Sequence, residues 1–213
     1  DLANAPMVWG VSSSSCIYNS DTGEQVTGIR GQRLYVLVAD ARDIPRAGKT
    51  LFDRLWLAGH GCFIVSKSGQ PLNRAPIDSS VWQTNRLDFA APPVCVNPLE
   101  ARRPEPEAIN NSAAPLVTAT AIPDLSEEER QQLAELIAQE KGCDDLLLEI
   151  KLARDAWIEE RLETMPNLNE GDREEARQRL QDAVEKRRLF GDFALTHQTG
   201  RTVTVGELLD NPE

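Results

Sequence analysis

The sequence predicts a mixed protein, with a front sheet domain of α/β or α+β class and packed helices, followed by an all-α helical hairpin or small bundle. Strand-like apolar segments fill the first hundred residues, whereas helical spacing of apolar residues dominates after residue 125. The charge balance also differs between the two parts, because it is slightly positive up to residue 103 and strongly negative from residue 104 onward. A chain of 213 residues is long enough for one large or two small domains.

The front is predicted to have the element order β–β–β–α–β–β, and its clearest strands are Met7–Val11, Leu34–Val38 and Phe63–Val65. The second is almost continuously apolar, which is typical of a strand covered on both faces. Ser68-Gly69 is a turn signal after the third. We expect a further strand or tight irregular segment that contains Ile77, Val81, Leu87 and Phe89.

One helix is predicted inside the front. Asp43 can cap it and Pro45 suits its first turn, so that Asp40 and Asp43 are interpreted as structural acids. Gly59 and Gly61 should end it. Its expected buried face consists of Leu51, Phe52, Leu55 and Trp56, at helical spacing.

The back is predicted to be an acidic helical region at residues 125–190. A linker at residues 101–124 precedes it, and the start of a further segment follows it at residues 191–213. Ser126 and Glu129 form a capping box. A break at Gly142 precedes a second helix, and a third runs from about Asp172 to Leu189. Their apolar stripes are thin, so each helix should pack on one partner. The tail 202–205 is expected to start a strand, with a helix after it.

Charge separates the two halves. Residues 1–103 contain 11 Lys and Arg against 9 Asp and Glu, a balance of +2, whereas residues 104–213 contain 12 against 25, a balance of −13. The front can therefore face an anion, and the back alone would repel a phosphate backbone. No apolar run reaches membrane-spanning length and the start is no signal peptide, so we expect a cytoplasmic protein with no membrane contact, and a start that is a cut.

Four cysteines lie far apart in the sequence, and no CxxC pair exists. We expect buried free thiols without zinc. The alternative is that His60 and Cys62 are two ligands of a zinc site. A structural zinc ion needs more ligands than these two. The cysteines are Cys16, Cys62, Cys95 and Cys143.

Asp78 is the most interesting single residue for chemistry, although no complete catalytic motif is present. It follows apolar Ile77, and Arg74 and Arg86 lie on either side. A carboxylate at a strand end can bind a divalent metal, and flanking arginines can hold phosphates. The alternative is a loop aspartate in surface ion pairs.

Four segments carry a family resemblance: Val11–Tyr18 with Asp21–Glu24, Gly31–Val36, Arg54–Gly61 and Ile77–Trp82. In this order they resemble primase-like replication proteins of phages, plasmids and integrated elements, which are similar to the archaeo-eukaryotic primase (primase-polymerase) superfamily. The resemblance covers about residues 7–98 and continues loosely into 202–209. It implies that residues 1–100 are a primase-like domain that lacks its start, and that a helicase or ATPase region of the same or another chain is a partner.

The resemblance also implies roles. Asp78 would be catalytic and hold Mg²⁺ or Mn²⁺ for nucleotidyl transfer in primer synthesis. Residues 1–100 would bind single-stranded nucleic acid template and nucleotides, with contacts from Ser13, Ser15, Arg33, Lys67, Arg74 and Arg86.

Two departures from the family pattern leave a second interpretation open. Arg33 stands where the family usually has histidine, and no Asp-x-Asp pair exists in the chain. Two-metal transfer needs several carboxylates. The alternative is therefore a non-catalytic nucleic-acid-binding or scaffolding module, whose acidic helices dock a helicase or ATPase partner.

Overall fold

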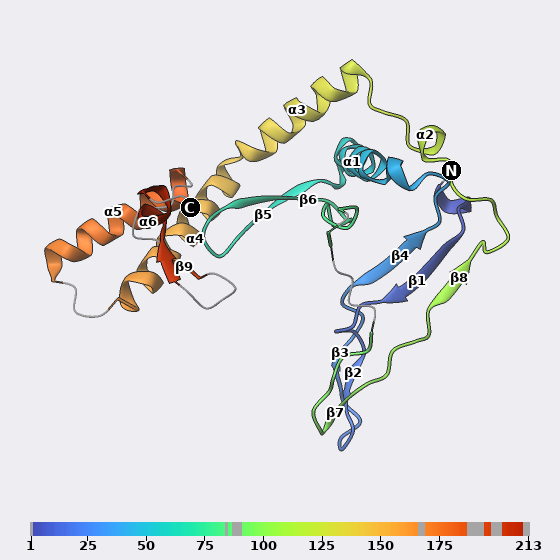
Figure 1. The fold of residues 1–213 in the computed structure, drawn as a ribbon, viewed down its shortest axis with the longest axis horizontal. Helices are drawn as coiled ribbons and strands as arrows, with labels where there is room; N and C mark the ends of the chain where they lie inside the picture. Colours follow the sequence, from blue (N-terminus) through green and yellow to red (C-terminus); the bar gives the residue numbers. More distant parts are fainter. Residues whose placement is uncertain are drawn as a thin grey trace. The chain divides into compact units, whose positions relative to one another are not determined.

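A computed structural model describes residues 2–83, 85–86, 91–165, 169–186, 194–196 and 202–210. The chain divides into two compact units, each built from two separate stretches. The first comprises Asp1–His60 with Ala75–Leu133, and the second comprises Gly61–Arg74 with Ala134–Glu213. The predicted mixed class is confirmed: small antiparallel sheets are combined with helices that lie mainly in the C-terminal half (Figure 1).

The first sheet of the first unit has the strand order β4-β1-β8. Both neighbours run antiparallel to β1, with Trp9 opposite Leu34 of β4 and Glu107 of β8. The three strands are β1 (Met7–Val11), β4 (Gln32–Val36) and β8 (Glu107–Ile109). The predicted strand at Met7–Val11 is therefore confirmed residue for residue.

The predicted burial of Leu34–Val38 on both faces is wrong. Leu34 is 54% exposed and Leu37 is 57% exposed. The physical reason is that β4 belongs to a small antiparallel sheet, which can leave its faces open to water; the consecutive residues Leu34 and Tyr35 point to opposite faces, and both are exposed. An apolar run shows that a segment can be buried, and it does not show which elements cover it.

The second sheet has the order β3-β2-β7, with strands β2 (Ile17–Asn19), β3 (Gln25–Thr27) and β7 (Leu99–Ala101). Since β8 and a short helix, α2 (Thr118–Ala121), also fall in 101–124, that segment is no plain linker, which corrects the prediction. Strands of three residues are too short to show the alternation of apolar and polar side chains by which a strand is predicted from sequence. Pro104 and Pro106 lie outside β8, so they do not interrupt its ladder.

Helix α1 (Ile44–Leu55) is the predicted front helix, and a wider turn, Trp56–His60, follows it. Gly59, at φ 80°, ends this turn as predicted. Phe52 and Trp56 are buried, and Trp56 is only 1% exposed. Asp43 occupies the N-cap position, but its side chain makes no capping bond, which corrects that prediction. Asp40 instead caps the short 3₁₀ turn Ala41–Asp43, by accepting the Arg42 N–H.

The second unit contains the hairpin of β5 (Cys62–Val65) and β6 (Pro71–Arg74), which confirms the strand and turn predicted there. The hairpin packs on α4 (Asp144–Glu163), which also packs on α5 (Glu170–Lys186). Leu162, Ile158 and Val184 are buried among these helices. Gly69, at φ 72°, sits so close to α4 that a Cβ there would lie 2.7 Å from the Ile150 carbonyl oxygen.

Helix α3 (Glu127–Lys141) begins at the predicted capping box: the Ser126 hydroxyl accepts the Glu129 N–H, and the Glu129 carboxylate accepts the Ser126 N–H. The helix ends before Gly142, as predicted. The predicted tail strand is β10 (Thr202–Thr204), paired with β9 (Ala194–Thr196) and followed by α6 (Val205–Asp210).

Some predictions fall on residues that the structure does not describe, namely Leu87, Phe89 and the end of the third back helix at 187–189. Within the described part of the chain, no helix is long and apolar enough to cross a membrane.

Candidate functional site

The four serines after β1 form a tight turn that is fixed to the segment leading into β4. The Ser15 side chain is completely buried; its hydroxyl accepts the Arg30 N–H at 3.0 Å and lies 2.9 Å from the Ser12 hydroxyl. Ser12 in turn accepts the Gly31 N–H at 3.2 Å, and its own N–H donates to the Gly31 carbonyl. Ser13 lies in the same turn and is half-buried. The Ser15 hydroxyl is thus already engaged within the turn.

Arg33 lies next to this turn. It stands on β4 opposite Gly10 of β1, and its guanidinium donates to the carbonyl of Val11 at 3.4 Å. Because Ser12 directly follows Val11, the serine turn and Arg33 occupy the same end of the β1–β4 pair. The structure therefore brings together two of the motifs that carry the family resemblance.

Asp78 opens an exposed turn in the first unit. Its Oδ1 accepts both the Ser80 N–H at 2.9 Å and the Ser80 hydroxyl at 2.8 Å. An aspartate that bonds the backbone two residues ahead stabilises a turn. Arg86, also exposed, belongs to the same irregular segment. Asp78 therefore has a structural task already, and any metal would be added to that task.

A tryptophan attaches the Asp78 segment to α1. The Trp82 ring meets the Phe52 ring edge to face, with centroids 6.5 Å apart. It also covers Gly48, where a Cβ would lie 2.4 Å from the indole. Only glycine leaves room for this contact. The sequence contained one signal for it, a glycine in the middle of a helix, where glycine is otherwise unfavourable.

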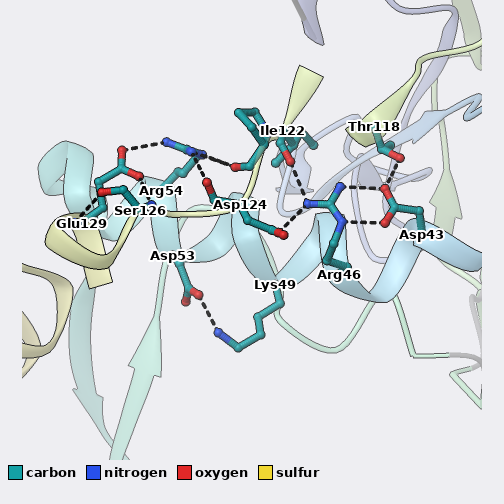
Figure 2. Close-up of polar contacts among 11 residues, drawn as sticks. Asp43, Arg46, Lys49, Asp53, Arg54, Thr118, Ile122, Asp124, Ser126 and Glu129 are labelled. Atoms are coloured by element: carbon teal, nitrogen blue, oxygen red, sulfur yellow. Dashed lines mark hydrogen bonds and ion pairs between the residues drawn. The ribbon is translucent and has the colours of Figure 1, made fainter. Parts of the chain in front are cut away.

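Between α1 and the Asp78 segment lies a cavity of about 720 Å³. Asp53, whose side chain is 18% exposed, accepts a hydrogen bond from Lys49 at 2.6 Å on this wall (Figure 2). The lining residues are Pro45, Lys49, Phe52, Asp53, Ser79, Trp82, Gln83 and Asn85. Sequence reasoning missed these residues, because Lys49 and Asp53 look like an ordinary helical ion pair.

Other polar residues of α1 hold the segment 118–129 (Figure 2). Arg46 binds Asp43, Asp124 and the Ile122 carbonyl, and Arg54 binds Glu129. Hydrogen bonds from the Arg46 guanidinium, and to a smaller extent from the Thr118 hydroxyl, lower the pKa of the Asp43 carboxyl to about 2. Every group in this network is satisfied by another part of the first unit, so its role is structural.

Lys67 and Arg74 belong to the second unit, whereas the other predicted site residues belong to the first. Lys67, on the hairpin turn, forms an ion pair of 2.7 Å with Glu160 of α4. Arg74 lies on β6 opposite Cys62.

The cysteines are free. Cys16 is buried, but the predicted burial is wrong for Cys62 and Cys143, which are exposed because they lie at the ends of elements. Within the described residues, no group of three or more His, Cys, Asp or Glu side chains is arranged to hold a metal ion.

Comparison with known protein families, curated proteins and solved structures gives no match for this chain. Any functional assignment therefore depends on the sequence motifs and on the geometry of the described residues.

Proposed function

We propose that the chain is part of a primase or primase-polymerase of a mobile genetic element, with a primase-like fold in its first unit. The observation that carries the proposal is the interlocking of the serine turn with Gly31, beside Arg33 on β4. Motifs that are nearly twenty residues apart in sequence form one corner of the sheet, as a shared site requires. The positive balance of residues 1–103 suits a nucleotide or a single-stranded template there.

In this proposal, Asp78 contributes one carboxylate to Mg²⁺ or Mn²⁺. A divalent cation held there would supply Lewis-acid chemistry at the nucleotide's phosphate. Carboxylate oxygens are the ligands that these cations prefer, so Asp78 fits the role. It is a single ligand, and the proposal requires further carboxylates from residues outside the described part of the chain.

The chain's own residues would bind the phosphates. Arg33 presents a guanidinium that suits a triphosphate, although it lacks the geometry of an imidazole. Ser13 and Arg86 are the other candidates in the first unit. Ser15 would have to give up its bonds inside the turn, so we expect it to act by shaping the turn.

The test is nucleotide incorporation on a primed single strand by the full-length protein with Mg²⁺ or Mn²⁺. Asp78→Asn is the sharpest variant, because an amide oxygen can still accept the Ser80 hydrogen bonds while the negative charge is lost. A metal ligand predicts that Asp78→Asn abolishes incorporation with unchanged thermal stability. Glu105→Gln, at an exposed acid of the same unit outside the segments that carry the resemblance, is the matched control and should keep full activity. Full activity of Asp78→Asn would refute the catalytic proposal.

A second candidate function is a non-catalytic module that docks a helicase or ATPase region. The observation that favours it is an apolar patch on α4 in which Leu147, Leu148 and Leu152 are 49%, 57% and 60% exposed. Apolar side chains clustered on an otherwise charged helix are typical of interaction surfaces. If Leu148→Lys with Leu152→Lys abolishes binding of the purified helicase region while Asp78→Asn leaves replication intact, this second function is the correct one.

A further inference from the structure

The cavity between α1 and the Asp78 segment has no part in the roles assigned above. Its volume of about 720 Å³ falls in the range typical of small-molecule sites, about 300–1,000 Å³. All its lining residues belong to the first unit.

Two aromatic rings give the cavity its apolar walls. Phe52 is buried, and Trp82 is half-buried with its ring packed on Gly48. Because the contact with Gly48 leaves no room for even a methyl group, α1 fixes the position of the indole. A ring held in this way is a ready surface for a flat, unsaturated ligand.

The polar groups of the cavity select the chemistry of that ligand. The two charged groups among the lining residues are the Asp53 carboxylate, 18% exposed, and the Lys49 ammonium, 75% exposed, which donates to it at 2.6 Å. The carboxylate accepts hydrogen bonds from amine and ring N–H groups, whereas the positive charge lies on the more exposed lysine. The exposed amides of Gln83 and Asn85 can each donate and accept in one plane, the pattern that pairs with the edge of a base.

We propose that this cavity binds the heterocyclic base of a nucleoside or nucleotide. The base lies against Trp82 and Phe52, Asp53 accepts from its amino or ring N–H group, and any phosphate stays outside near solvent. The inference rests on the proposed function for its biological meaning, since a nucleotidyl-transfer module needs a base site. The cavity lining contains neither Asp78 nor Arg33, and base binding there needs no metal.

The experiment is calorimetric titration of the full chain without divalent metal. The probes are adenosine, guanosine, cytidine and thymidine, with ribose 5-phosphate as the ligand that lacks a base. At least one nucleoside should bind, and ribose 5-phosphate should not. Asp53→Asn should weaken nucleoside binding about tenfold or more, because a charge-assisted hydrogen bond is lost.

Gly48→Ala is the second variant, because it places a methyl group against the indole while alanine favours the helix. Circular dichroism should show α1 retained, and nucleoside binding should fall about tenfold or more. Glu105→Gln, at an exposed acid that does not line the cavity, should bind nucleosides as the unchanged chain does. The inference would be overturned if none of the four nucleosides binds, or if both cavity variants bind nucleosides as tightly as the unchanged chain.

Failure of the inference and failure of the proposed function give different results. Asp78→Asn should still bind nucleosides, because no metal takes part in this titration. If nucleosides bind but Asp78→Asn incorporates nucleotides at the rate of the unchanged protein, the base site is supported and the catalytic proposal is refuted. If incorporation needs Asp78 while no nucleoside binds, the catalytic proposal stands and the base site falls.

Discussion

Arg46 holds both carboxylate oxygens of Asp43: its Nε lies 2.5 Å from Oδ1, and its Nη2 lies 2.7 Å from Oδ2 (Figure 2). The same guanidinium reaches the Ile122 carbonyl and Asp124, 76 and 78 residues further along the chain. One side chain therefore connects the start of α1 to the segment that precedes α3.

The first prediction concerns acid stability. Because Arg46 lowers the pKa of Asp43 from 3.8 to about 2, the folded state prefers the charged carboxylate. This contribution is complete above the unfolded pKa and is lost as the pH falls from about 4 to about 2. Arg46→Met should lower stability at neutral pH, and its deficit against the unchanged chain should shrink across that window. Urea denaturation at several pH values measures the difference.

Arg42→Met is the control for this prediction. Its partner is Asp40, but the Arg42 side chain is 91% exposed, and solvent-exposed ion pairs contribute little. It should follow the unchanged chain at every pH. If Arg46→Met shows the same deficit at pH values above and below the window, the pair is not the source of the acid sensitivity.

The second prediction concerns the start of α3. Ser126→Ala removes the hydroxyl that accepts the Glu129 N–H, and loss of such a cap costs about 0.5–2 kcal/mol. Chemical denaturation followed by circular dichroism measures it. Ser112→Ala, at an exposed turn, should be neutral within about 0.5 kcal/mol. An unchanged midpoint for Ser126→Ala would show that α3 begins without help from its cap.

The third prediction separates backbone strain from steric overlap. Gly23 and Gly69 both have φ of 72°, but a Cβ at Gly23 would meet nothing within 4 Å, whereas one at Gly69 would meet Ile150 and Arg154 of α4. Alanine at Gly23 should cost about 1–2 kcal/mol from the left-handed backbone alone. Alanine at Gly69 should cost a further 1–3 kcal/mol or so from overpacking. Equal losses in denaturant titrations would show that the hairpin can move off α4.

The fourth prediction tests the core of the second unit. Leu162 is 1% exposed and Leu152, on the same helix, is 60% exposed. Leu162→Ala should lower the free energy of unfolding by about 2–5 kcal/mol because it leaves a cavity. Leu152→Ala should change it by less than about 0.5 kcal/mol. Thermal unfolding of both variants measures the contrast, and similar effects would place the core elsewhere.

The sequence predicts the parts of this fold that depend on neighbours along the chain. The capping box at Ser126 and the glycine turn at Gly59 involve residues only a few positions apart, and both are present. The pairing of β8 with β1 joins residues about a hundred positions apart, and β8 has only three residues, so no local pattern reveals it.

The same limit applies to the candidate site. Asp78 and Arg33 stand out because of their residue types, and both belong to the first unit. The packing of Trp82 on Gly48 joins two segments that are far apart in the sequence. The ion pair of Lys49 with Asp53 has the spacing of an ordinary surface pair on a helix. Tertiary contacts of this kind leave no local pattern in the sequence, so the residues of the cavity are not predicted as site residues.

The division of the chain has a practical consequence for dissecting the protein. The chain passes from one unit to the other at residues 60–61, 74–75 and 133–134, so neither unit is an uninterrupted stretch of sequence. A fragment ending at residue 124 would keep the β5–β6 hairpin and remove the helix on which Gly69 rests. Truncation at any single position therefore removes part of at least one unit. The edit that would isolate the first unit ends the chain after residue 133 and also replaces residues 61–74 by a short loop.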